Sequence, residues 1–270
     1  MSDNQAEKLA LGVDVGSLTT KAVLLGNDKV LSSSVIQSAD TAELSARTAV
    51  AEVLAGSGLS AEDQVYIVTT GAGGKAVSFS RESKSITTCL ARGIRYLFPS
   101  VRMAIDMGAE SLTVIKVNDR GRLSDWGNQD KCAAGTGVFL QQMAKLMQMP
   151  LEDMARLSFK AKSRAEVSST CAVFAESEVI SHIHRVPPTP KEDIVAGIYL
   201  SMVHRILTVC KRVGIEKDVA AVGGVARNSG LVSILQEELG FEVLVPESPE
   251  ETAALGAAIL ARESINKSVS

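Results

Sequence analysis

The feature that most constrains the fold is an apolar segment ending in Asp-x-Gly, which occurs twice. The first copy ends at Asp14–Gly16 and the second at Asp106–Gly108, about 92 residues further along the chain. Each copy is followed by another apolar segment, a pattern typical of two antiparallel strands joined by a turn. An internal repeat of this kind predicts two related halves. The low aromatic content, 4%, with many Ala, Gly and Val residues is typical of an α/β protein.

The turns of the repeat contain residue types that suit a phosphate group and a magnesium ion. Gly16 permits close backbone approach, Ser17 and Thr19 offer hydroxyl groups, and Asp14 can hold a metal-bound water. On this stretch alone an ordinary hairpin turn is the alternative. The second copy favours phosphate binding, because a nucleotide clamped by two related halves needs one such turn from each.

A third glycine turn follows the apolar segment Val219–Val222. Gly223 and Gly224 would let the backbone approach a flat ligand, and Asn228 either caps the next helix or touches that ligand. The turn is therefore a candidate for the nucleoside end of the same site.

Two cysteines occur in similar contexts. Cys132 precedes the small-residue loop Gly135–Gly137, and Cys171 follows a Ser/Thr-rich segment; a helical pattern comes after each. A helix N-terminus offers backbone N–H groups and the positive end of the helix dipole, so it can hold a phosphate or stabilise a thiolate. Cys89 and Cys210 lie among apolar residues and are interpreted as core thiols.

Composition excludes several classes of function. The net charge of −3 comes without a basic stripe, which argues against a nucleic-acid partner. The longest apolar runs are too short for a membrane span, and the polar N-terminus fits neither a signal nor a transit peptide. We expect a cytoplasmic protein. The three histidines do not have the spacing of a zinc site.

The three glycine turns, in this order, resemble the nucleotide clamp of the actin, Hsp70 and sugar-kinase superfamily. The resemblance implies two ribonuclease-H-like subdomains, 1–100 and 101–270, that close on Mg-ATP, with the last helix (about 249–263) returning to the first. It implies Asp14 and Asp106 as catalytic residues. The residues expected to bind the nucleotide are Gly16, Ser17, Thr19, Lys21, Gly108, Gly135, Thr136, Gly137, Gly223, Gly224 and Asn228.

The cysteine segments resemble a narrower family, the activators of 2-hydroxyacyl-CoA dehydratases and the ATPase subunits of benzoyl-CoA reductase. The segments are Asp130–Gly137 and Ser169–Ser181. The resemblance implies that Cys132 and Cys171 are metal ligands, and that a dimer of identical or paralogous subunits shares one [4Fe–4S] cluster. ATP hydrolysis would then drive an electron from ferredoxin or flavodoxin to a partner iron–sulfur enzyme acting on a CoA thioester.

One departure from the family pattern lies in the second phosphate motif. Family activators usually read Asp-Ile-Gly-Gly-Gln-Asp, whereas Ala109, Glu110 and Ser111 occupy the last three positions here. The change favours a subunit of the benzoyl-CoA reductase type slightly over a dehydratase activator. The alternatives are a sugar-type kinase of the same superfamily and a nucleotide-binding subunit that does not hydrolyse ATP.

Overall fold

The computed structural model describes residues 9–27, 29–59, 65–129 and 136–267. The chain forms two compact units. The first contains the residues up to Ser100, Val117–Leu123 and the residues from Glu250 onward, and the second contains Val101–Lys116 and Ser124–Pro249. The last helix is therefore part of the first unit.

The first unit is built on a five-stranded sheet in the order β3-β2-β1-β4-β5. Its central strand β1 pairs antiparallel with β2 and parallel with β4. The strands are β1 (Leu9–Val15), β2 (Thr19–Gly26), β3 (Lys29–Gln37), β4 (Val65–Thr70) and β5 (Glu82–Ser83). The first predicted hairpin is confirmed, and β1 continues through Asp14 to Val15, which were expected in the turn.

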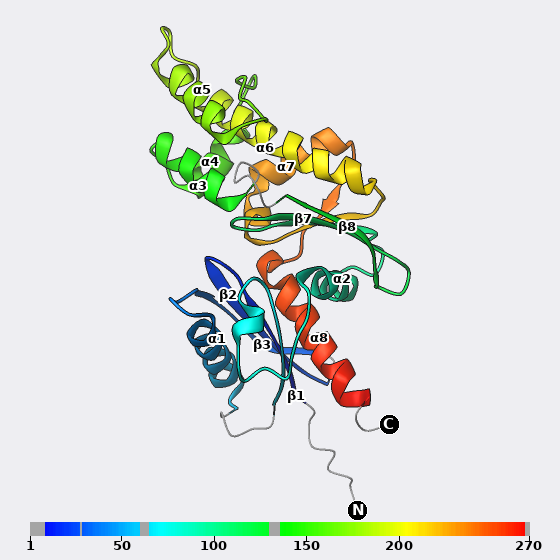
Figure 1. The fold of residues 1–270 in the computed structure, drawn as a ribbon. Helices are drawn as coiled ribbons and strands as arrows, with labels where there is room; N and C mark the ends of the chain where they lie inside the picture. The colour runs from blue at the N-terminus through cyan, green and yellow to red at the C-terminus, as the bar shows by residue number, and fades with distance from the viewer. Residues whose placement is uncertain (1–8, 28, 60–64, 130–135, 268–270) are drawn as a thin grey trace, which may run out of the picture. The chain divides into compact units, whose positions relative to one another are not determined.

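Helices cover both faces of this sheet, which is why every residue of β1 is buried. Alternate side chains of β1 pack on α1 (Ala42–Ser57) and on α8 (Thr252–Lys267). Figure 1 shows α8 lying beside α2 (Ile86–Leu97). The two backbones touch, since a Cβ on Gly256 would lie 1.8 Å from the carbonyl oxygen of Cys89.

The second unit repeats this plan in the order β10-β9-β6-β7-β8, with β6 antiparallel to β7 and parallel to β9. The predicted repeat of the hairpin is confirmed. The strands are β6 (Met103–Met107), β7 (Leu112–Val117), β8 (Leu123–Gln129), β9 (Val219–Val222) and β10 (Val243–Leu244). The helices are α3 (Gly137–Leu146), α4 (Leu151–Ser158), α5 (Ala172–His184), α6 (Lys191–Val213) and α7 (Ser229–Leu239).

Helix α6 forms the centre of the second unit's core. Among the described residues it is the one helix long and apolar enough to cross a membrane, with a mean hydropathy of 1.4, but 83% of that window is buried inside the protein. Its neighbours in the core include side chains of β6, α3 and α7. Burial of most of its side chains therefore accounts for its apolar composition.

Candidate functional site

In the first unit, the end of β1 brings Asp14 against Lys21 of β2. The Nζ atom of Lys21 lies 3.4 Å from Oδ2 of Asp14 and donates to the carbonyl oxygen of Thr19 at 3.2 Å. The turn is closed by the N–H of Gly16, which donates to the same carbonyl at 3.2 Å. A Cβ on Gly16 would lie 3.4 Å from that Nζ. Four of the predicted site residues are thus brought together, and Ser17 lies exposed at the tip of the turn.

Burial makes the carboxyl group of Asp14 unusual. Desolvation raises its pKa above the usual range, and the ammonium group of Lys21 offsets part of that rise. Gly71, at the end of β4, packs on the carboxylate so closely that a Cβ there would lie 2.4 Å from Oδ1. Gly71 was not predicted as a site residue. A buried carboxylate held by one cation and a glycine turn suits a magnesium ion and its phosphates.

In the second unit, the end of β6 brings Asp106 against the turn after β9. Gly223 has a φ of +82°, and a Cβ there would lie 2.6 Å from Oδ1 of Asp106 and 2.5 Å from the carbonyl oxygen of Met107. Only glycine fits this position. Gly224 has nothing within 4 Å of where its Cβ would be. The structure therefore places the second and third glycine turns side by side, as a nucleotide site requires.

The start of α3 is held by the second phosphate turn, which corrects one sequence-based expectation. The N–H groups of Gly137 and Val138 were expected to be free for a ligand, but they donate to the carbonyl oxygens of Gly108 and Ala109 at 3.0 and 2.9 Å. Thr136 is the N-cap residue of α3 and is buried. The helix that follows the Cys132 loop is thus bonded to the turn expected to bind phosphate.

Asn228 takes the capping role, one of its two predicted alternatives. Its Oδ1 accepts the N–H of Leu231 at 3.0 Å, and its Nδ2 donates to the hydroxyl of Tyr199 at 2.9 Å. With both ends of the amide used inside the unit, Asn228 orients the turn between β9 and α7. Contact between its side chain and a ligand remains a prediction.

Of the two predicted metal ligands, the structure describes Cys171. It is the N-cap residue of α5, in extended conformation, and is partly exposed. Cys89 and Cys210 are fully buried, and burial raises the pKa of each thiol to about 12. Cys171 is thus the one accessible thiol among the described residues, and it lies at a helix N-terminus. Cys132 and Gly135 lie outside the described residues, within which no three His, Cys, Asp or Glu side chains form a metal-binding group.

The surface beyond Cys171 is apolar. Val173 and Phe174, in the first turn of α5, are 65% and 63% exposed, and Ile180 lies exposed two turns later. Large apolar side chains at such exposure are typical of surfaces that bind another protein.

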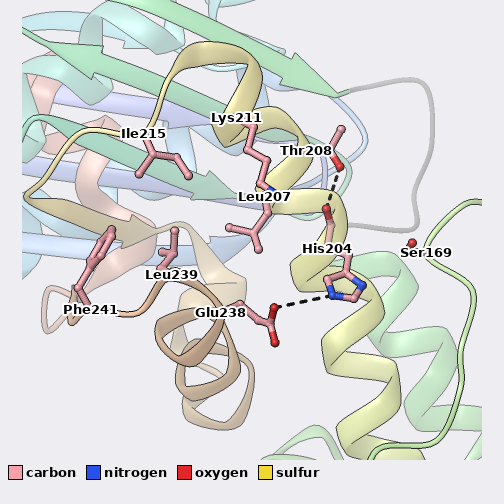
Figure 2. A pocket seen from close by; sticks show the side chains of 9 residues that line it. All are labelled: Ser169, His204, Leu207, Thr208, Lys211, Ile215, Glu238, Leu239 and Phe241. Atoms are coloured by element: carbon pink, nitrogen blue, oxygen red, sulfur yellow. Dashed lines mark hydrogen bonds and ion pairs between the residues drawn. The ribbon is translucent and has the colours of Figure 1, made fainter.

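A shallow hollow of about 420 Å³ lies beside the segment that leads to Cys171 (Figure 2). His204, Thr208 and Lys211 project into it from one side of α6, and Ser169 lies at its edge. These residues were not predicted as site residues, although their spacing of four and three marks one exposed side of a helix.

Comparison with known proteins identifies the family. The chain matches the BadF/BadG/BcrA/BcrD ATPase family over residues 11–261. It belongs to that family. The resemblance drawn from the cysteine motifs is confirmed, and so is the prediction of an ATPase.

The relatives include dehydratase activators and one component of a reductase. The chain is 38% identical over 258 residues to the 2-hydroxyisocaproyl-CoA dehydratase activator of Clostridioides difficile, covering 96% of both chains. It is 32% identical over 264 residues to a subunit of the benzoyl-CoA reductase of Thauera aromatica, covering 93% of this chain and 92% of that one. These identities do not support the slight preference for the reductase type.

Solved structures confirm the fold class. A structure of the activator of the 2-hydroxyisocaproyl-CoA dehydratase from Clostridium difficile, with bound ADPNP, matches with a TM-score of 0.90 at 38% identity and 96% coverage of both chains. A glucokinase of the ROK family from Streptomyces griseus matches with a TM-score of 0.56 at 13% identity, covering 94% of this chain and 99% of that one. The second likeness shows the fold alone, which this chain shares with a sugar kinase.

Proposed function

We propose that this protein is an ATP-dependent activator of a 2-hydroxyacyl-CoA dehydratase. Two copies, or one copy and a paralogous ATPase subunit, hold a [4Fe–4S] cluster through Cys132 and Cys171 of each. The observation that carries the proposal is the accessible thiol of Cys171 at a helix N-terminus, in a chain 38% identical to such an activator over nearly its whole length.

The carboxylates of Asp14 and Asp106 would both bind the magnesium ion of Mg-ATP. Asp14 lies beside Lys21 in one unit and Asp106 beside Gly223 in the other, so each unit offers one carboxylate next to a glycine turn. We assign them to the magnesium shell. The hydroxyls of Ser17 and Thr19, Lys21 and the backbones of Gly16 and Gly108 would then bind the phosphates, and the turn at Gly223–Gly224 the nucleoside.

The cysteines of one chain are too few to hold a [4Fe–4S] cluster, so a second chain is needed. A cubane cluster needs four thiolates, and this chain has two cysteines besides the buried Cys89 and Cys210. Two-fold symmetry doubles that pair, Cys132 and Cys171, to four. The exposed Val173, two residues after Cys171, gives such a dimer an apolar contact surface. The cluster supplies one-electron transfer at low potential, from reduced ferredoxin or flavodoxin to the partner dehydratase.

Nucleotide and cluster are linked through the start of α3. The turn at Gly108–Ala109, which we expect beneath the phosphates, accepts the first two N–H groups of this helix. The Cys132 loop comes directly before the helix in the sequence. A shift of this turn on ATP binding or hydrolysis would therefore be transmitted to the ligand loop without any intervening segment. The methyl group of Ala109 and the acidic Glu110 make slow hydrolysis the expected behaviour.

Iron counting under anaerobic conditions tests the proposal. We expect about four irons and four sulfides per two chains, with a brown chromophore that bleaches on reduction by dithionite. Cys171→Ser should lose the iron and keep ADPNP binding. The matched control is Cys210→Ser, because that thiol is fully buried in α6 and should leave the iron content unchanged. Full iron content in Cys171→Ser would refute the ligand assignment, and a colourless wild-type protein that binds ATP would favour a kinase or a non-hydrolysing subunit.

A further inference from the structure

An irregular segment of the second unit, residues 162–170, leads directly to Cys171. We call it the ligand strap. No helix or strand forms within it, so its backbone polar groups find partners outside regular secondary structure. The partners of those groups decide how firmly Cys171 is held.

The first half of the ligand strap is anchored on α6 by Asp193. The N–H groups of Lys162 and Ser163 donate to Oδ1 of Asp193 at 2.9 and 3.1 Å, and the Ser163 hydroxyl donates to Oδ2 at 2.8 Å. These bonds hold the pKa of Asp193 below its usual range. The N–H of Ala165 donates to the backbone oxygen of Asp193 at 2.9 Å. This half is therefore fixed independently of α5.

The second half is anchored on α5, the helix that Cys171 begins. The N–H of Ser168 donates to Oε2 of Glu178 at 2.5 Å. One turn further along α5, the Nε2 atom of His182 donates to the carbonyl oxygen of Glu166 at 3.0 Å. The other ring nitrogen of His182 lies 3.0 Å from the hydroxyl of Thr189 beyond the end of α5. Two side chains of α5 thus hold the backbone of the ligand strap at Glu166 and Ser168, shortly before Cys171.

We propose that Glu178 and His182 are positioning residues for Cys171, setting where its thiol lies for the cluster. This inference rests on the proposed ligand role of Cys171. Groups that do not touch a metal but hold one of its ligands in place contribute to metal affinity, because they restrict the ligand's position. Glu178 acts at a residue three before the cysteine. The N–H of Thr170, the residue before Cys171, donates to the Ser168 hydroxyl at 3.2 Å and so links the cysteine's neighbour to the residue that Glu178 holds.

If Glu178 and His182 only stabilised the fold, replacing them would lower the thermal stability of the protein. Helix α5 is held in the core by Ala175 and Val179, both fully buried, and Asp193 holds the first half of the ligand strap. Removing the Glu178 carboxylate therefore frees only the residues nearest Cys171. The expected result is a change at the thiol with little change in the thermal stability of the protein.

The experiment uses the full-length protein loaded with its cluster. Variants Glu178→Ala, Glu178→Gln and His182→Ala are compared with Glu176→Ala, a matched control on the same helix. The readouts are the rate of iron loss to a chelator and the electron paramagnetic resonance spectrum after reduction. We expect Glu178→Ala and His182→Ala to lose iron about 10–100-fold faster with an altered spectrum. Glu178→Gln keeps an acceptor oxygen for the N–H of Ser168, so it should behave like wild type.

The outcomes separate this inference from the proposed function. Wild-type protein without iron would overturn both. Iron-loaded wild type, with Glu178→Ala and His182→Ala releasing iron at the wild-type rate and showing the wild-type spectrum, would overturn the positioning role alone. If Glu178→Ala does not fold, His182→Ala decides by the same two measurements.

Discussion

The contact between Gly223 and Asp106 allows a test of the nucleotide-binding turns expected in the second unit. In the substitution Gly223→Ala, the new methyl group would lie 2.5 Å from the oxygen of Met107 and 2.6 Å from the Asp106 carboxylate. The backbone conformation, with φ at +82° and ψ at 165°, is one that essentially only glycine adopts, which costs an alanine about 1–3 kcal/mol. Relief of the clash adds about 1–3 kcal/mol. The expected loss of unfolding free energy is therefore about 2–6 kcal/mol.

Gly240→Ala is the matched control in the same unit. Gly240 also has a positive φ, +75°, but nothing lies within 4 Å of its Cβ position. The variant Gly240→Ala should lose only the free energy of unfolding that the backbone strain costs, about 1–2 kcal/mol. Denaturant titrations followed by the fluorescence of Trp126, the chain's single tryptophan, report on this unit for both variants.

Ligand binding adds a second readout. Because Asp106 must move away from a methyl group at position 223, we expect Gly223→Ala to bind Mg-ADPNP at least about tenfold more weakly, or about 1.4 kcal/mol. Gly240→Ala should bind it as wild type does, and calorimetric titration measures both. Equal stability and equal affinity in the two variants would refute the reasoning, since the Asp106 carboxylate would then not be held against this turn.

Three further predictions concern the first unit. Asp14→Asn should stabilise the nucleotide-free protein at pH 7: burial raises the pKa of Asp14, so the ionised form costs free energy at neutral pH, and the gain should vanish in thermal melts as the pH falls below about 4. Glu82 has its pKa lowered to about 2 by Lys84, Tyr66 and Ser264. Glu82→Gln should therefore cost about 0.5–1 kcal/mol above pH 4.5, a loss that disappears as the pH falls towards 2. Gly256→Ala should lower the melting temperature, because its Cβ would meet the backbone of Cys89 at 1.8 Å, and an unchanged melt would contradict that contact.

The hairpins, their repeat and the glycine turns could be predicted because their signals are local. Apolar segments that end in Asp-x-Gly define strand, turn and return strand within about 20 residues. Strand β8 and helix α4 were not predicted. The first reads Leu-Ser-Asp-Trp-Gly-Asn-Gln and has one buried residue, Gly127, at a sheet edge, so no apolar alternation marks it. The second is only eight residues long, with one fully buried side chain, Met154.

The contacts that define the site depend on residues distant in the sequence. Gly71 reaches Asp14 because β4 pairs with β1, and no pattern in the chain specifies which strand lies next to β1. The N–H group of Gly137 was expected to be free, because its partner lies 29 residues earlier in a different element. Glycine turns predict where a ligand can approach, while pairing between strands decides which side chains meet there.

The bonds between the second phosphate turn and α3 lead to a last prediction, which needs no mutation. If this turn responds to nucleotide, Mg-ADPNP should slow amide hydrogen exchange at Gly137 and Val138, whose N–H groups donate to Gly108 and Ala109. Exchange measured by mass spectrometry on peptides around 106–110 and 136–140 tests this directly. The N–H of Gly240, bonded to Gln236 at the end of α7, serves as the control and should be unaffected. Protection confined to the 106–110 peptide would show that nucleotide binding stops at the turn, and the coupling to the cysteine loop would then have to follow another route.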